Sequence, residues 1–184
     1  SFTRAHHISL HITWVPRSAN QAADALSHFY DAADWSLHPS IFQHLHRSWG
    51  PFSIDRFASS TNHHLPTFNS YFWCPDSAGI NAFLQSDWHR HFNWFFPPFS
   101  MIPQLLSLLI RTRAPAAVLL PFWPSRPWWP LLADGPLFRP FVKSCKLFNP
   151  QDFPTFLVPG PSLASAPQHF LRWKFIHSHL LLQH

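Results

Sequence analysis

The chain contains no glutamate, and this absence limits its acid–base and metal chemistry. Every side-chain carboxylate must come from aspartate, so any general acid, general base or carboxylate ligand of a cation is one of eight residues. These are Asp24, Asp31, Asp34, Asp55, Asp76, Asp87, Asp134 and Asp152.

Cysteine is scarce as well. The two cysteines, Cys74 and Cys145, show no spacing that is typical of a metal site or a redox pair. We therefore expect free thiols and an intracellular protein, in the nucleus or the cytoplasm. The 15 histidines are scattered, without an HExxH or paired-cysteine pattern, so we expect no metal ion in this chain.

Long apolar runs are also missing. No run approaches the roughly 20 residues that cross a bilayer, and no signal peptide is visible, so we expect no membrane partner. Only 11% of the residues are charged, but lysine and arginine outnumber the acids by 13 to 8. The resulting net charge of +5 favours nucleic acid as a partner, although a dry, sparsely charged surface would explain the same numbers.

Proline, in contrast, is abundant. Its 20 residues indicate many short elements and ordered loops rather than a helical bundle. Near the N-terminus, apolar and polar residues alternate from His7 to Val15, which predicts a half-buried strand. Asn20 is then suited to cap a helix that runs through Leu26.

The stretch WVPRSANQAADALS, residues 14–27, resembles the end of the ribonuclease H domain in retroelement polyproteins, which reads W-V-P-x-x-x-N-x-x-A-D-x-L-S. The resemblance implies that Asp24 belongs to the carboxylate cluster that holds divalent metal in that family. The other carboxylates of the cluster are absent from this sequence, so we expect no ribonuclease H activity from it. A solvated aspartate on a helix is the alternative for Asp24.

Helix and strand patterns alternate from residue 37 onward. Apolar residues at helical spacing after Pro39 predict a helix that stops at Gly50-Pro51. Residues 52–55 then predict a short strand that ends at Asp55. Because ligands of open α/β sheets lie beyond the carboxyl ends of strands, Asp55 is a candidate for contacting a cofactor.

A second strand is predicted from Asn93 to Phe96, followed by a Pro97-Pro98-Phe99 turn and a helix capped by Ser100. Another buried strand is predicted over 116–120, which completes a right-handed βαβ unit. Two prolines remove two backbone donors, so carbonyl groups at this turn can accept hydrogen bonds from a ligand. The Phe99 ring offers a face on which a flat ligand can stack.

Residues 121–132 are dense in aromatic side chains and contain a single arginine. In a functional interpretation, Arg126 contacts phosphate while Trp123 or Trp128 stacks on an exposed base. In the structural alternative, the aromatic rings pack this proline-rich loop onto the core. The same two interpretations apply to Asp87-Trp88, where Trp88 can be core and Asp87 a cap or a salt-bridge partner.

The motifs from residue 49 onward occur in the order of the region that follows ribonuclease H in DIRS-like retrotransposons. They are WGP-x-x-IDRFAS over 49–59, then Asn62, Leu65-Pro66, Phe68, Asp87-Trp88 and the Pro-Pro turn. That region carries a domain similar to phage-type adenine-N6 DNA methyltransferases. The resemblance implies S-adenosylmethionine as cofactor, Asp55 and Asp87 on its side of the site, and Arg126 and Trp128 toward nucleic acid.

In those enzymes an Asn/Asp-Pro-Pro-Tyr/Phe motif grips the exocyclic amine of a flipped adenine. This chain reads Phe96-Pro97-Pro98-Phe99, and the phenyl ring of Phe96 accepts no useful hydrogen bond, so the catalytic motif is degenerate. The segment 56–60, where a glycine-rich cofactor loop should follow the first strand, contains no glycine. Both departures predict weak or absent methyl transfer.

The sequence thus predicts an α/β protein with a Rossmann-like, methyltransferase-type sheet and helices on its faces, preceded by a strand–helix remnant of ribonuclease H. We assign 1–36 to that remnant and a connector, 37–158 to the methyltransferase-like domain, and 159–184 to a linker and tail. The expected partners are DNA or an RNA–DNA hybrid and the rest of a retroelement polyprotein.

Two other functions stay open. One is an active S-adenosylmethionine-dependent adenine-N6 methyltransferase, and the other is a non-enzymatic scaffold between ribonuclease H and a recombinase. A metal-dependent nuclease has only Asp24 in its favour.

Overall fold

A computed structural model describes residues 35–148, 156–159 and 179–183 of the chain. The predicted strand over 7–15, the helix that begins near Asn20 and the ribonuclease H position Asp24 lie outside the described residues. None of the described helices is long and apolar enough to cross a membrane.

Two α-helices are described, and each begins with a proline in its first turn, as the sequence predicts. Helix α3 spans Pro39–Trp49, and Gly50 ends it by donating its backbone N–H to the carbonyl of His46. Helix α4 spans Ile102–Thr112 and ends at Arg113, which adopts a left-handed conformation with φ of 54°. The prediction that Ser100 caps α4 is wrong, because Ser100 lies inside a preceding 3-10 turn and Met101 is the cap.

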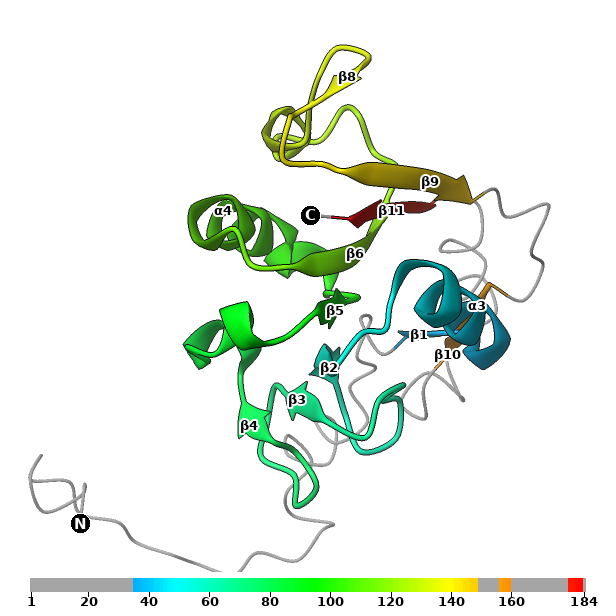
Figure 1. Cartoon of the computed structure of the whole chain (residues 1–184), viewed down its shortest axis with the longest axis vertical. Coiled ribbons are helices and arrows are strands. Elements are labelled where there is room, and N and C mark those ends of the chain that lie inside the picture. Colours follow the sequence, from blue (N-terminus) through cyan, green and yellow to red (C-terminus); the bar gives the residue numbers. More distant parts are fainter. Residues whose placement is uncertain (1–34, 149–155, 160–178, 184) are drawn as a thin grey trace, which may run out of the picture. The chain divides into compact units, whose positions relative to one another are not determined.

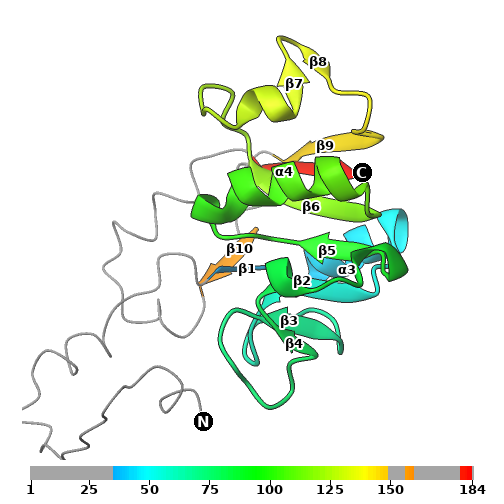
Figure 2. The same ribbon diagram turned by 90° about the vertical axis from the view of Figure 1, so that its left-hand side faces the viewer.

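The main sheet has seven strands in the order β4-β3-β2-β5-β6-β11-β9. The first five of these are parallel, and β11 runs antiparallel to both of its neighbours (Figures 1 and 2). Their bounds are β2 Ile54–Ala58, β3 Phe68–Ser70, β4 Gly79–Ile80, β5 Asn93–Phe95, β6 Ala116–Pro121, β9 Ser144–Phe148 and β11 His179–Gln183. The mixed α/β content and the parallel sheet agree with a Rossmann-like fold.

Short elements complete the described part of the chain. Strand β1 pairs antiparallel with β10, and β7 pairs antiparallel with β8. These strands are β1 Trp35–Leu37, β7 Ala133–Asp134, β8 Leu137–Phe138 and β10 Leu157–Pro159, and the 3-10 turns are η2 Ala82–Leu84, η3 Trp88–Arg90, η4 Phe99–Met101 and η5 Trp129–Leu131.

The sheet has a hydrophobic cluster on each face, because successive residues of a strand point to opposite sides. In β6, Ala116, Val118 and Leu120 join one cluster. Ala117 and Leu119 join the other. Helix α4 covers the first face and α3 the second (Figure 1).

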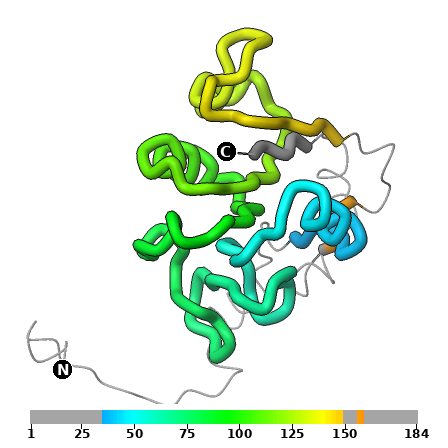
Figure 3. Tube along the Cα trace, viewed as in Figure 1, coloured from blue at the N-terminus to red at the C-terminus, as the bar shows by residue number. Residues whose placement is uncertain are grey.

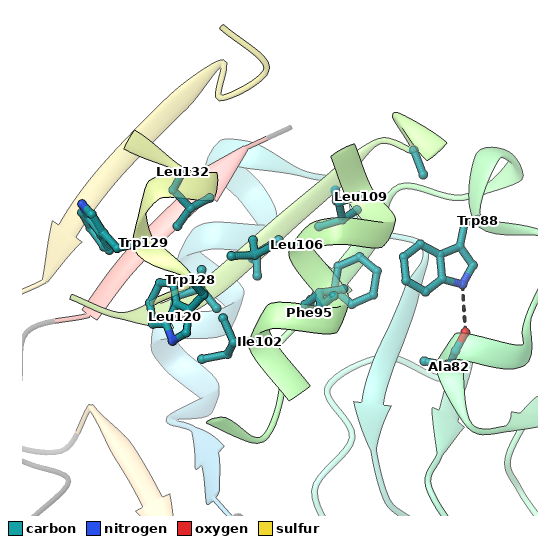
Figure 4. Packing of buried hydrophobic residues seen from close by; sticks show 14 of the residues in the cluster. Ala82, Trp88, Phe95, Ile102, Leu106, Leu109, Leu120, Trp128, Trp129 and Leu132 are labelled. Atoms are coloured by element: carbon teal, nitrogen blue, oxygen red, sulfur yellow. Dashed lines mark hydrogen bonds between the residues drawn. The ribbon is translucent and has the colours of Figure 1, made fainter. Parts of the chain in front are cut away.

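We name each cluster after the helix that covers it. The α4-face cluster comprises Ala82, Trp88, Phe95, Ile102, Leu105, Leu106, Leu109, Ala114, Ala116, Val118, Leu120, Trp128, Trp129, Leu132 and Ala133 (Figure 4). The α3-face cluster comprises Trp35, Leu37, Phe42, Leu45, Phe52, Leu65, Trp94, Ala117, Leu119, Phe148, Phe156 and Leu157.

Two stretches differ from the predicted layout. Strand β2 begins at Ile54 and continues to Ala58, so Asp55 is its second residue and does not lie at its carboxyl end. The range 159–184, assigned from the sequence to a linker and tail, contributes His179–Gln183 as β11 inside the main sheet. Three consecutive leucines between histidine and glutamine form too short a pattern to predict such a position in the sheet.

Candidate functional site

The chain reverses its direction of travel across the sheet at the border of β2 and β5. From β2 it proceeds outward through β3 to the edge strand β4, and it then returns past β2 to form β5 (Figure 3). The two strands are neighbours and parallel, with Ile54 beside Asn93 and Asp55 beside Trp94. In doubly wound sheets, ligands lie beyond the carboxyl ends of the strands at such a reversal. The residues after Ala58 and after Phe95 are therefore the first candidates for a site.

The Pro-Pro turn follows β5 directly. Pro97 is buried, and Phe96 is partly buried against the α3-face cluster. The Pro98 carbonyl accepts the backbone N–H of Met101 at 2.9 Å, and this bond starts the 3-10 turn that leads into α4. One of the two prolyl carbonyls is thus engaged within the protein.

Phe99, the aromatic residue of the Pro-Pro turn, packs against the segment that follows β6. The Phe99 ring lies edge-on to Trp123, with ring centroids 4.9 Å apart and an interplanar angle of 69°. The guanidinium of the exposed residue Arg126 lies 5.0 Å from the centroid of the Trp123 ring. The fold therefore gathers Phe99, Trp123 and Arg126 at neighbouring strand ends.

Trp128, the other predicted base-stacking residue, is 7% exposed and belongs to the α4-face cluster. Figure 4 shows it with Leu120 and Ile102. Its burial favours the structural interpretation, in which the ring packs the proline-rich loop onto the core.

Asp55 is a buried carboxyl, and only 3% of the residue is exposed. Its Oδ2 accepts the backbone N–H of His64 at 3.1 Å. Burial raises the pKa of Asp55 to about 7, against the opposing effect of hydrogen bonds from the backbone of His64 and Phe57. Because β2 extends three residues beyond it, Asp55 is held inside the sheet and away from the carboxyl edge where we expected a cofactor contact.

Asp87 forms an ion pair with the buried residue Arg56. Its Oδ1 lies 2.9 Å from Nη2 of Arg56, and its Oδ2 lies 3.2 Å from Nε2 of His91. Partial burial acts to raise the pKa of Asp87, but the hydrogen bond and charge of Arg56, together with His91, outweigh it and lower this pKa. The structural alternative, a salt-bridge partner beside a core tryptophan, describes what Asp87 does here.

Asp55 and Asp87, which the resemblance places on one side of a cofactor, lie on opposite faces of the sheet. The backbone partner of Asp55 is His64, whose ring stacks on Phe42 of the α3-face cluster at 4.4 Å. The partner of Asp87 is Arg56, whose guanidinium lies 5.9 Å from the ring centroid of Trp88 in the α4-face cluster. These two carboxylates therefore do not line the same side of one cofactor site.

Two asparagines complete a polar network around Arg56 that the sequence analysis missed. Arg56 Nε donates to Oδ1 of Asn93 at 2.7 Å, and Nη1 donates to Oδ1 of Asn69 at 2.7 Å. The Asn93 amide also donates to the carbonyls of Trp88 and Pro115. The sequence carried little signal for this network, because Arg56 lies one residue beyond the predicted strand 52–55. A fully buried guanidinium needs several acceptors, and only the fold brings them together.

The residues after β2 do not fit S-adenosylmethionine. The Ser59 N–H that follows the strand donates to Oδ1 of Asn62 at 2.7 Å, and the Ser59 carbonyl accepts the N–H of His63. The turn thus closes on itself, and no helix occurs in the segment 59–67, which the structure describes in full. Without a glycine turn or a helix N-terminus, this position lacks the usual cradle for the cofactor.

Within 35–148 and the two shorter described stretches, no group of three or more histidine, cysteine or aspartate side chains is placed to hold a metal ion. No protein-family model matches the chain, and no curated protein matches it.

Proposed function

We propose that this chain carries a methyltransferase-like domain of a DIRS-like retrotransposon polyprotein, which binds nucleic acid and does not transfer methyl groups. The observation that carries the proposal is the order β4-β3-β2-β5-β6-β11-β9, with one reversed strand inserted before the last. The sequence resemblance supplies the retroelement context, and the strand order supports the Rossmann-like part of the proposal.

The strand order supports the proposal through its five parallel strands. Counting from β2, the five parallel strands follow the 3-2-1-4-5 arrangement of a doubly wound nucleotide-binding sheet. The antiparallel β11 between β6 and β9 extends this sheet, and the proposal assigns the whole sheet to the methyltransferase type that the sequence resemblance implies.

The loss of catalysis rests on three side chains. Phe96 replaces the acceptor of the target amine, and one missing transition-state hydrogen bond typically costs about a hundredfold or more in rate. Asn93 cannot replace that acceptor, because its carbonyl accepts from Arg56 and its amide is shared among backbone carbonyls. Asp55 is buried and bonded to the His64 backbone, so it is unavailable to a cofactor.

Nucleic-acid binding is supported by charge and by the site at the strand ends. The chain has a net charge of +5, and Arg126 is exposed next to the aromatic pair Phe99 and Trp123. An arginine held over an aromatic ring can contact a phosphate while the ring lies against a base or sugar.

Binding is tested by fluorescence polarisation of labelled DNA with the purified full chain at several salt concentrations. We expect binding that weakens as salt rises from about 50 to 200 mM, because phosphate contacts release counterions. Arg126→Ala should weaken binding and flatten the salt dependence. Arg47→Ala, an exposed arginine on α3, is the matched control and should change neither.

Catalysis is tested by incorporation of a labelled methyl group from S-adenosylmethionine into adenine-containing DNA. We expect no transfer and no saturable cofactor binding in a titration. Methyl transfer to adenine by the wild-type chain would establish the active enzyme instead. Failure of the chain to bind any nucleic acid at low salt would favour the scaffold between ribonuclease H and a recombinase.

A further inference from the structure

We propose that a single-stranded nucleic acid runs along the carboxyl edge of the parallel strands and stacks an unpaired base on the segment Tyr71–Trp73, here called the aromatic turn. This inference rests on the proposed nucleic-acid binding and names both its partner class and its stacking site.

The aromatic turn is exposed to an unusual degree. Tyr71, Phe72 and Trp73 are 52%, 78% and 73% exposed, directly after the last residue of β3. Large aromatic rings are normally buried, and in this chain Trp88 and Trp94 are each no more than 2% exposed. Adjacent exposed rings on a folded surface are a common sign of a binding site.

Hydrogen bonds hold the aromatic turn in a defined shape. The Ser70 hydroxyl donates to the carbonyl of Phe72 at 2.6 Å. The Ser77 hydroxyl donates to the carbonyl of Gly79 at 2.8 Å and accepts the N–H of Ser70 at 3.1 Å. The N–H of Asn81 donates to the Ser70 carbonyl at 2.7 Å. A ring presented by such a turn loses little conformational freedom on binding, which preserves the stacking energy.

The aromatic turn and Arg126 lie at the same edge of the sheet. Strands β3, β2, β5 and β6 are parallel neighbours, so the residues that follow each of them emerge on one side. Three strand spacings of about 4.8 Å separate β3 from β6, which gives a distance of about 14 Å along this edge. A few nucleotides of single strand can span this distance, with phosphate near Arg126 and a base on the aromatic turn.

An unpaired strand suits this surface better than a duplex or an apolar protein. A base inside a duplex already has both faces covered by its neighbours, whereas an unpaired base offers a free face to a protruding ring. The charge also matches a polyanion, because the chain carries +5 and the only acid in 71–80 is Asp76.

The test compares a labelled oligothymidine with a duplex of equal length, using polarisation and the full chain. We expect Phe72→Ala/Trp73→Ala to weaken single-strand binding by about tenfold or more and to leave duplex binding unchanged. Trp73→Phe keeps a stacking face and should retain most of the affinity. Leu137→Ala removes a side chain that is 72% exposed on β8 and is the matched control, without effect.

Each other outcome has a distinct meaning. If the double variant binds single strands like the wild type while Arg126→Ala weakens binding, the aromatic turn is not the site, although the proposed function stands. If the wild type binds neither ligand at low salt, the proposed function itself fails. Light scattering tests whether the aromatic turn binds a second copy of the chain instead. A wild-type dimer that the double variant abolishes would show this and would overturn the proposal.

Discussion

The two faces of the sheet bury opposite charges and neutralise them by different means. On the α4 face, Arg56 is surrounded by Asn69, Asn93 and Asp87, so its charge has three side-chain acceptors. On the α3 face, the Asp55 side chain accepts hydrogen bonds from the backbone of His64 and Phe57, and burial raises the pKa of Asp55 to about 7.

The comparison shows that the charge state of a buried group depends on the partners that neighbouring strands supply. Arg56 reaches β3 and β5 because an asparagine stands on each of them, at Asn69 and Asn93. Asp55 lies level with Phe68 and Trp94 on the same two strands, and neither offers a charged partner. An ion on the first face therefore stays charged, whereas the carboxyl on the second face shifts toward its neutral form.

Removal of the arginine should have the largest effect. We expect Arg56→Ala to lower the free energy of unfolding by about 3–5 kcal/mol, because it leaves buried acceptors without a donor. Arg56→Lys should recover only part of this loss, since one ammonium cannot serve three acceptors in a fork. Urea unfolding followed by tryptophan fluorescence measures both, with Arg47→Ala as the exposed control. A loss below 1 kcal/mol would mean that the network does not hold the strands together.

Removal of the carboxylate partner should cost less. We expect Asp87→Asn to lower the free energy of unfolding by about 1–3 kcal/mol. The side chain of Asp87 is 39% exposed, and Arg56 keeps both asparagine acceptors in this variant. The same urea series measures it, and a loss equal to that of Arg56→Ala would show that the ion pair outweighs the amide bonds.

The buried groups of the α3 face should make the stability of the protein depend on pH. Between pH 3.8 and about 7 the folded chain keeps a proton on Asp55 that the unfolded chain releases, so this group lowers the stability as pH rises. Burial also lowers the pKa of His64 from 6.5 to about 4, so this ring raises the stability as pH rises over that range. The two effects oppose each other between about pH 4 and 6.5.

Single variants should separate these two effects. In His64→Gln the unfolding equilibrium constant should increase with pH by up to about tenfold per unit, and in Asp55→Asn it should decrease with pH by a similar factor. Urea midpoints measured from pH 4 to 7 give both slopes. His44→Gln, an exposed histidine on α3, should follow the wild type. Equal slopes in all variants would contradict the pKa shifts of both groups.

The smallest effect on stability is expected at the aromatic turn, which contacts neither face extensively. Trp73→Ala should change the free energy of unfolding by no more than about 0.5 kcal/mol, because the side chain is 73% exposed. Thermal unfolding followed by circular dichroism measures this change. A large destabilisation would show that the Trp73 ring contributes to the stability of the fold, as the buried residues of the two faces do.

The sequence predicts those elements whose apolar pattern is long or sharply bounded. Helix α3 begins at Pro39 and ends before Gly50, and β6 is a continuous apolar strand, both as expected. Strand β5 ends one residue earlier than predicted, and the Pro-Pro turn follows it. Proline and glycine mark these boundaries because their backbone restrictions act locally.

The polar interior could not be predicted in the same way. The partners of Arg56 come from residues 13 and 37 positions away, and only the pairing of three strands brings them together. The error at Asp55 has a similar cause, because the length of β2 depends on pairing with β3 and β5 rather than on its own residues. The exposed aromatic turn was missed because no periodic pattern marks residues 71–73, and only the fold shows that the three rings stay exposed.

The reversed strand β11 has a consequence for how the polypeptide matures during synthesis. Strands β2 to β6 can associate as soon as Pro121 has left the ribosome, because each of them pairs with another strand of this group. Strand β9 is translated before β11, and among the described strands it pairs only with β11. It therefore joins the sheet only after His179–Gln183 has emerged and paired with both β6 and β9. A nascent chain that stalls before this point leaves the open side of β6 available to other strands, and such an intermediate is prone to aggregate.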